Sequence, residues 1–211
     1  RFVVTRPGER RPEASRDAGA AGPELVLAGN LLVDDLVFAD GRTRMGQAGG
    51  ATLYVALAAS LWGVRVGVVS VAGADYPAET LAALGARGVD LAGVVKLPGP
   101  GLRTWLLYEP STRRVVHQLG RPSHAEVSPA PAQVPHAYSS ARAFHLAPMP
   151  LKCQRALVRH LASFSGALIS IDPYESLTER TAPDWRAVLS EVDGFFPSED
   201  ELSLQGTGCD P

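Results

Sequence analysis

The segment from Gly46 to Asp75 (GQAGGATLYVALAASLWGVRVGVVSVAGAD) constrains the fold more than any other part of the chain. Residues 51–62 are nearly all good helix formers or small packing residues, and Gly63 stands where a left-handed C-terminal cap belongs. Residues 64–72 follow as a β-branched run with few polar positions, which is typical of a strand covered on both faces in a parallel sheet. A helix followed directly by such a strand indicates the crossover connection of an α/β domain.

The predicted helix over 51–62 carries apolar residues on almost every side. These residues are Leu53, Val55, Leu57, Ala58, Leu61 and Trp62. We therefore expect the helix to be sandwiched inside a larger domain. Gly49 and Gly50 precede it, and two residues without side chains at a helix N-terminus allow a ligand to approach unpaired backbone N–H groups. Taken alone, such a pair is more commonly a simple turn or cap.

Composition bounds the class of protein. The chain has 211 residues, of which 45% are hydrophobic and 20% charged, so it can bury a full core as one large domain. Its 20 basic and 22 acidic residues give a net charge of −2, which disfavours nucleic acid and anionic membrane as partners. Cys153 and Cys209 lack C-x-x-C spacing, the five histidines lack metal spacing, and no apolar run is long enough to span a bilayer. These features predict a cytoplasmic protein with reduced thiols and no zinc site.

Strands and helices are predicted to alternate from residue 24 onward. Strands are expected at 25–29, 64–72, 143–146, 167–171 and 192–196, and helices at 51–62, 78–87, 151–161 and 185–190. The proline-rich stretch 120–135 is expected to be a loop without elements. Strands separated by helices indicate a mostly parallel sheet with right-handed crossovers.

Two hairpins interrupt this alternation and predict a separate small flap. One spans 36–45, where Asp40-Gly41 suits a two-residue turn, and the other joins strands at 102–108 and 114–119. Residues 1–23 are rich in Arg, Pro, Gly and Ala without periodicity, and we expect a disordered arm there. The domain is predicted to cover 24–204, with a tail at 205–211.

The order of these motifs resembles the PfkB/ribokinase family of carbohydrate kinases over residues 24 to about 204. The resemblance implies a three-layer α/β/α sandwich of the ribokinase type, with the hairpins at 36–47 and 101–119 forming a β lid that includes Arg103 and Trp105. It places Asp34, in GNLLVD, and the pair Gly49-Gly50 against the hydroxyls of a sugar. The family's G-G-x-x-x-N motif has Asn where this chain has Tyr54, a phenol that cannot present an amide carbonyl, so the substrate stays open.

Later segments resemble the family's nucleotide side. Ile171-Asp172-Pro173 is similar to its strand end beside the substrate, and FFPSEDE to its P-N-x-x-E motif, which implies that Glu201 organises water around Mg²⁺. The sequence S-x-x-E at 198–201 is also a capping box, and Asp75 in the G-x-D motif is also a plausible helix N-cap, so both local explanations stay open. The catalytic G-A-G-D motif does not occur; the tail at 206–211 resembles it only by coincidence.

The resemblance implies ATP·Mg²⁺-dependent phosphorylation of a hydroxyl on a sugar or nucleoside. The printed chain would supply the substrate half and would be inactive alone, so no catalytic residue is assigned. One alternative is an inactive sugar-binding or regulatory protein, favoured by Tyr54 and Ser198. Another is a nicotinamide-dependent Rossmann enzyme, although no G-x-G-x-x-G follows the first strand. The lid could also pair with a second copy through Trp105, Leu107 and Tyr108.

Overall fold

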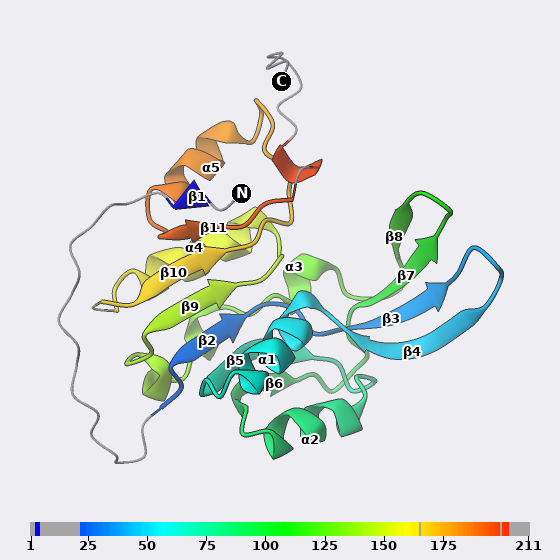
Figure 1. The fold of residues 1–211 in the computed structure, drawn as a ribbon, viewed down its shortest axis with the longest axis horizontal. Helices are drawn as coiled ribbons and strands as arrows, with labels where there is room; N and C mark the ends of the chain where they lie inside the picture. Colours follow the sequence, from blue (N-terminus) through cyan, green and yellow to red (C-terminus); the bar gives the residue numbers. More distant parts are fainter. Residues whose placement is uncertain (1–2, 5–21, 165, 199, 203–211) are drawn as a thin grey trace.

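The computed structural model describes residues 3–4, 22–164, 166–198 and 200–202. Its larger sheet has seven strands in the order β1-β11-β10-β9-β2-β5-β6 (Figure 1). Every neighbouring pair is parallel except β1 with β11. The strands are β1 Val3–Val4, β2 Leu25–Ala28, β5 Val66–Ala72, β6 Asp90–Lys96, β9 Ala143–Leu146, β10 Leu168–Ile171 and β11 Gly194–Phe195. Apart from 3–4 and 22–23, the predicted N-terminal arm lies outside the described residues, as do 205–211.

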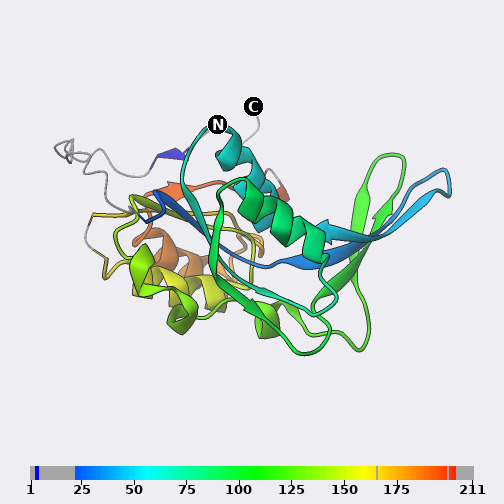
Figure 2. The same cartoon turned by 90° about the horizontal axis from the view of Figure 1, so that it is seen from below.

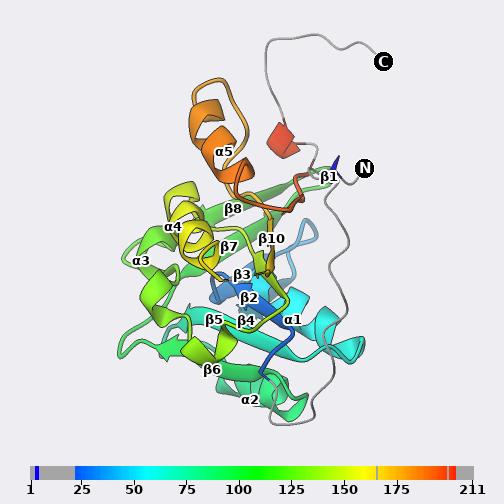
Figure 3. The ribbon, with the colours of Figure 1, turned by 90° about the vertical axis from the view of Figure 1, so that its left-hand side faces the viewer.

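Helices cover both faces of this sheet, which confirms the predicted α/β/α sandwich (Figures 2 and 3). Helices α1 (Ala51–Leu61) and α2 (Ala78–Ala86) lie on one face, and α4 (Leu151–Leu161) and α5 (Ala182–Leu189) lie on the other. Strand β2 shows how the sheet feeds both cores, because Val26 and Ala28 belong to the cluster under α4 while Leu27 belongs to the cluster under α1. No helix in the described part of the chain is long and apolar enough to cross a membrane.

Strand β5 and helix α1 match their predicted positions, but the expected burial of α1 is wrong. All seven residues of β5 are buried, as a central parallel strand requires. In α1, however, only Thr52, Leu53 and Ala56 are buried, and the side chains of Leu61 and Trp62 are 82% and 87% exposed. The helix packs on one face of the sheet, so its other side and its last turn point outward.

A second, four-stranded sheet forms the lid, in the order β4-β3-β7-β8 (Figure 1). Its strands are β3 Leu32–Val37, β4 Thr43–Gly49, β7 Arg103–Tyr108 and β8 Arg113–His117. The two hairpins are joined because β3 pairs in parallel with β7. The expected two-residue turn is wrong: the N–H of Gly41 donates to the Phe38 carbonyl, and Gly41 has φ +84, which gives a three-residue loop.

Several predicted boundaries and one predicted loop differ from the structure. The stretch 120–135 contains helix α3 (His124–Val127) and the 3₁₀ turn η1 (Pro131–Gln133), so the prediction of a loop without elements is wrong. A capping box explains α3, because the backbone N–H and hydroxyl of Ser123 both donate to Glu126 at 2.7 Å. Further 3₁₀ turns are η2 (His136–Tyr138) and η3 (Asp200–Leu202).

Candidate functional site

Two adjacent carboxylates on β3 have opposite environments at the base of the lid. Asp34 and Asp35 are 8% and 1% exposed, and successive residues of a strand point to opposite faces of its sheet. Strand β4 carries a bulge beside them, between the pairs that Asp34 and Leu36 make with it. Gly46, with φ +67, lies in this bulge, a left-handed conformation that favours glycine.

Asp35 is fully occupied by the lid itself. Its two oxygens accept hydrogen bonds from Nε and a terminal nitrogen of Arg103, both at 2.7 Å, from the N–H of Gly46 at 2.7 Å, and from the Gln118 amide at 2.6 Å. The hydrogen bonds from Arg103 hold the pKa of Asp35 below its ordinary value against the effect of burial. Asp35 therefore ties β3, β4 and β7 together, and the predicted lid residue Arg103 is its partner.

Asp34 has far fewer protein partners. Its Oδ1 accepts a 2.5 Å hydrogen bond from the hydroxyl of Thr104 on β7. Burial raises the pKa of the Asp34 carboxyl, and the Thr104 hydrogen bond and the charge of Arg113 oppose this effect only in part. A buried carboxylate with unused acceptor positions is suited to accept hydrogen bonds from a polar ligand.

Gly49 and Gly50 bring the start of α1 against Asp34. A Cβ on Gly49 would collide with Oδ2 of Asp34, so the carboxylate and this backbone lie directly together. Gly50 is the N-cap residue of α1, and no side chain caps this helix and no acidic residue occupies its first turn. The helix therefore presents unpaired N–H groups and the positive end of its dipole beside Asp34. We call Asp34, Gly49, Gly50 and Thr104 the lid-base site.

The backbone at Gly50 requires glycine. Its φ is +101, and a Cβ there would collide with the carbonyl oxygen of Asn30. We expect Gly50→Ala to lower the free energy of unfolding by about 2 kcal/mol in urea titrations, because strain and collision add. Gly85→Ala is the matched control: Gly85 is exposed within α2, an added Cβ would meet only Leu91 at 4.0 Å, and alanine there should stabilise the protein by about 0.5–1 kcal/mol. Equal effects of both changes would contradict the assignment.

Tyr54 lies on α1 near the lid-base site, next to a second tyrosine. Tyr54 is 60% exposed, whereas Tyr76 is 5% exposed and its hydroxyl has no hydrogen-bond partner among the described residues. Burial raises the pKa of Tyr76, and the charges of Tyr54 and Asp34 add to this effect, which places the three groups within electrostatic reach. The phenol of Tyr54 is therefore exposed at the surface, within electrostatic reach of the buried Tyr76 and Asp34.

The G-x-D motif connects the sheet to the lid. Asp75 accepts hydrogen bonds from the N–H of Gly101 at 2.8 Å and from Arg121 at 2.7 Å. A Cβ on Gly73 would collide with the backbone of Gly101, so the end of β5 and the start of the lid cross closely. The N-cap residue of α2 is Pro77, without a side-chain cap bond, so Asp75 is not the N-cap.

A cluster of rings links the lid to the larger sheet, with His124 edge-on to His117 and tilted against Tyr174. The ring of His124 in α3 lies 4.8 Å from that of His117 at the end of β8 and 4.7 Å from that of Tyr174 after β10. Burial, with a smaller effect of His117, lowers the pKa of His124 to about 4, so its imidazole is neutral at pH 7. Asn30, after β2, donates to the carbonyl of His124 at 3.2 Å and positions this ring cluster.

Two carboxylates approach each other at the end of β10. Burial and the charge of Glu201 raise the pKa of Asp172 to about 6. Glu201 accepts a 2.6 Å hydrogen bond from the N–H of Ser198, as expected for a capping box. No group of three or more potential metal ligands is found in the described ranges. Two neighbouring carboxylates nevertheless suit Mg²⁺, which keeps several of its own waters.

The chain matches known proteins over most of its length. The model of the pfkB family of carbohydrate kinases matches residues 34–206. The chain belongs to this family. A cytidine kinase from Thermococcus kodakarensis is 32% identical over 197 residues, which cover 89% of this chain and 65% of that enzyme. The present chain therefore spans about two thirds of the length of that cytidine kinase.

Solved structures of pfkB-type kinases share the fold. A protein provisionally assigned as a ribokinase II from E. coli superposes with a TM-score of 0.67 at 20% identity, covering 88% of this chain and 66% of that chain. A fructokinase with bound ATP from Xylella fastidiosa gives a TM-score of 0.63 at 19% identity, covering 81% and 56%. At these low identities, the superpositions show that this chain shares the fold of the pfkB-type kinases. They do not identify its substrate.

Some residues of this pfkB chain near the lid-base site were not predicted. No role was predicted for Thr104, Tyr76 or His124. The position of Thr104 could have been found, because it follows from the alternation of side chains along its lid strand. His124 had no local signal, because its neighbours His117 and Tyr174 come from other elements. Of the predicted site residues, the fold brings Asp34, Gly49 and Gly50 together and leaves Glu201 near Asp172 instead. Trp105 lies half-buried in β7, opposite Val116. Pairing of the lid with a second copy stays a prediction.

Proposed function

We propose that this chain binds the acceptor alcohol of a kinase that transfers the γ-phosphoryl group of ATP to a hydroxyl of a nucleoside or related sugar. The observation that carries the proposal is the buried Asp34 carboxylate, held against Gly49 at the uncapped start of α1. The carboxylate accepts hydrogen bonds from acceptor hydroxyls, and the N–H groups of the helix donate to their oxygens. A nucleoside is favoured because the cytidine kinase is 32% identical to this chain.

Each part of the chain would make a separate contribution to phosphoryl transfer. The lid-base site orients the acceptor, and the lid excludes water from it, so alignment is the main contribution of these residues. Asp172 and Glu201 would face Mg²⁺: burial, and to a smaller extent the charge of Glu201, raises the pKa of Asp172, and a bound cation would offset both effects. Bound Mg²⁺ would supply charge neutralisation on the phosphates of ATP. Family membership argues against the nicotinamide-dependent alternative.

Calorimetry with the 211-residue protein tests the binding role. We titrate cytidine, ribose and fructose separately, and expect cytidine to bind at least tenfold more tightly than the two sugars. We also expect no ADP release from ATP by this chain with any of them, because the catalytic Asp motif implied by the family is absent from the printed sequence. Absence of binding by all three compounds would contradict the proposed function. Acceptor-dependent ADP release would contradict the proposal that this chain binds the acceptor without catalysing phosphoryl transfer by itself.

A further inference from the structure

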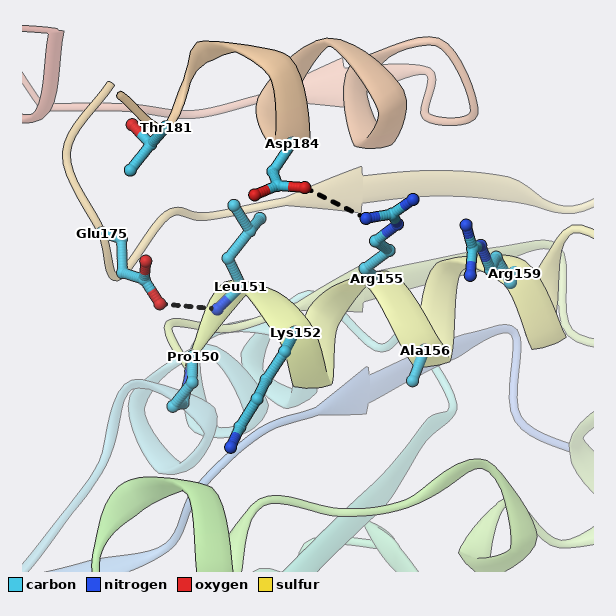
Figure 4. A pocket seen from close by; sticks show the side chains of 9 residues that line it. All are labelled: Pro150, Leu151, Lys152, Arg155, Ala156, Arg159, Glu175, Thr181 and Asp184. Atoms are coloured by element: carbon cyan, nitrogen blue, oxygen red, sulfur yellow. Dashed lines mark hydrogen bonds and ion pairs between the residues drawn. The ribbon is translucent and has the colours of Figure 1, made fainter. Parts of the chain in front are cut away.

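A pocket of about 470 Å³ lies on the outer side of α4, away from the lid-base site. Its lining residues come from α4, from the loop after β10 and from the start of α5 (Figure 4): Pro150, Leu151, Lys152, Arg155, Ala156, Arg159, Glu175, Thr181 and Asp184. Helix α1 lies across the sheet from α4 and α5 (Figures 2 and 3), and no lid-base residue lines the pocket. A ligand in this pocket would therefore contact none of the residues assigned to the acceptor.

The two ends of the pocket differ in chemistry. Figure 4 shows Arg155 and Arg159 at one end and Glu175 with Thr181 at the other. Pro150, Leu151 and Ala156 supply apolar surface between and beneath them. One end therefore attracts an anion, and the other offers the Glu175 carboxylate to hydroxyl groups, because the Thr181 hydroxyl is already bonded to Thr178 and Ser176.

The two arginines have hydrogen-bonding capacity that the protein leaves unused. Arg155 makes one contact of 3.1 Å, from one terminal nitrogen to Asp184, a carboxylate that is itself 63% exposed, and its other terminal nitrogen donates to no described residue. Arg159 forms no ion pair with any described residue. The two lie four residues apart on one face of α4, where like charges repel unless an anion lies between them. Guanidinium groups match the oxygen geometry of phosphate.

The acidic end is partly neutralised within the protein. Oε1 of Glu175 accepts the N–H of Leu151 at 3.0 Å, so this carboxylate satisfies the first turn of α4 and faces the start of the helix. Its other oxygen has no protein partner in the described residues and can accept a ligand hydroxyl. Lys152 extends from the other side of α4 (Figure 4) and adds positive charge at the rim.

We propose that this pocket binds a small phosphate ester with a hydroxyl-bearing body, with the phosphate on Arg155 and Arg159 and the hydroxyls toward the Glu175 carboxylate. Such a ligand belongs to the class of sugar phosphates and nucleotides. The site is independent of the acceptor site, and the proposal does not rest on the proposed function.

Ribose 5-phosphate is the probe, titrated into the 211-residue protein by calorimetry at low ionic strength. We expect saturable binding that weakens at least tenfold in the double variant Arg155→Gln/Arg159→Gln. Arg87→Gln also removes an arginine charge, at the exposed C-terminal end of α2 across the sheet, and should leave the affinity unchanged. Asp34→Asn distinguishes the two sites: it should leave the component of binding that depends on Arg155 and Arg159 unchanged.

Three results would overturn the proposal. They are no binding of ribose 5-phosphate to the unmodified protein, undiminished binding by the double variant, and loss in Asp34→Asn of the component of binding that depends on Arg155 and Arg159. Far-ultraviolet circular dichroism confirms that the double variant is folded, which is expected because both changes are at the surface of α4. Unphosphorylated ribose is the ligand control, and its affinity should not differ between the unmodified protein and the double variant.

Discussion

Replacing Asp35 by asparagine should lower the free energy of unfolding by about 3 kcal/mol, because it leaves Arg103 without its buried counter-charge. Asp35 is 1% exposed and accepts four hydrogen bonds, two of them from Arg103. An asparagine would keep the shape of the side chain. Its amide NH₂ would, however, replace an oxygen that accepts two of these hydrogen bonds, so that donors would face donors. Urea unfolding followed by circular dichroism measures the loss.

The lid supplies a matched control for this change. Asp40 also pairs with an arginine, Arg42, at 2.7 Å, but its side chain is 53% exposed. Because exposed ion pairs contribute little, Asp40→Asn should cost less than about 1 kcal/mol. If both variants lost the same stability, the hydrogen bonds of Asp35 would not be what holds the lid strands together.

Asp34→Asn should weaken binding of the acceptor about 100-fold while leaving the protein at least as stable as before. Loss of hydrogen bonds to a charged group accounts for about 2.7 kcal/mol of binding energy, which corresponds to that factor. Burial raises the pKa of Asp34 in the folded protein. The contribution of such a group to stability is present below its ordinary pKa and is lost as the pH rises through the raised value. At pH 7 the burial of Asp34 therefore costs folding free energy, and the neutral amide of the Asp34→Asn variant removes this cost.

Calorimetry with cytidine and a thermal melt test both halves of this prediction. The hydroxyl of Thr104 can still donate to the amide oxygen of the variant, so the local geometry at β7 should persist. Asp40→Asn again serves as the control and should bind normally. Unchanged affinity in Asp34→Asn would remove Asp34 from the binding site, whereas a large loss of stability would assign it a structural role like that of Asp35.

Local sequence patterns were sufficient to predict the alternating core. The β-branched run ending at Ala72 and the helix ending near Gly63 both occur as expected, because burial on two faces and a left-handed cap each leave a signal within a few residues. The outward side of α1 was mispredicted, since hydropathy alone does not tell which side of a mostly apolar helix faces the sheet. The helix α3 was missed because its surrounding prolines indicated a loop.

The candidate site shows the same limit at the level of single residues. The sequence pointed to Asp34, Gly49 and Gly50, which the fold brings together. It gave Asp35 no role, although Asp34 and Asp35 have opposite pKa shifts and opposite expected roles. That difference depends on Arg103, which is 68 residues away in the chain and reaches Asp35 only through the pairing of β3 with β7.

The sequence by itself determined the α/β class, the family and the glycines at the start of α1, because these depend on periodicity and on backbone conformations that only glycine adopts readily. Only the tertiary structure decided which carboxylate is occupied by the lid, which rings contact His124, and where Arg155 and Arg159 line a pocket. These properties are set by contacts between elements distant in the chain. Burial and hydrogen bonding act through space, and a linear pattern carries no record of them.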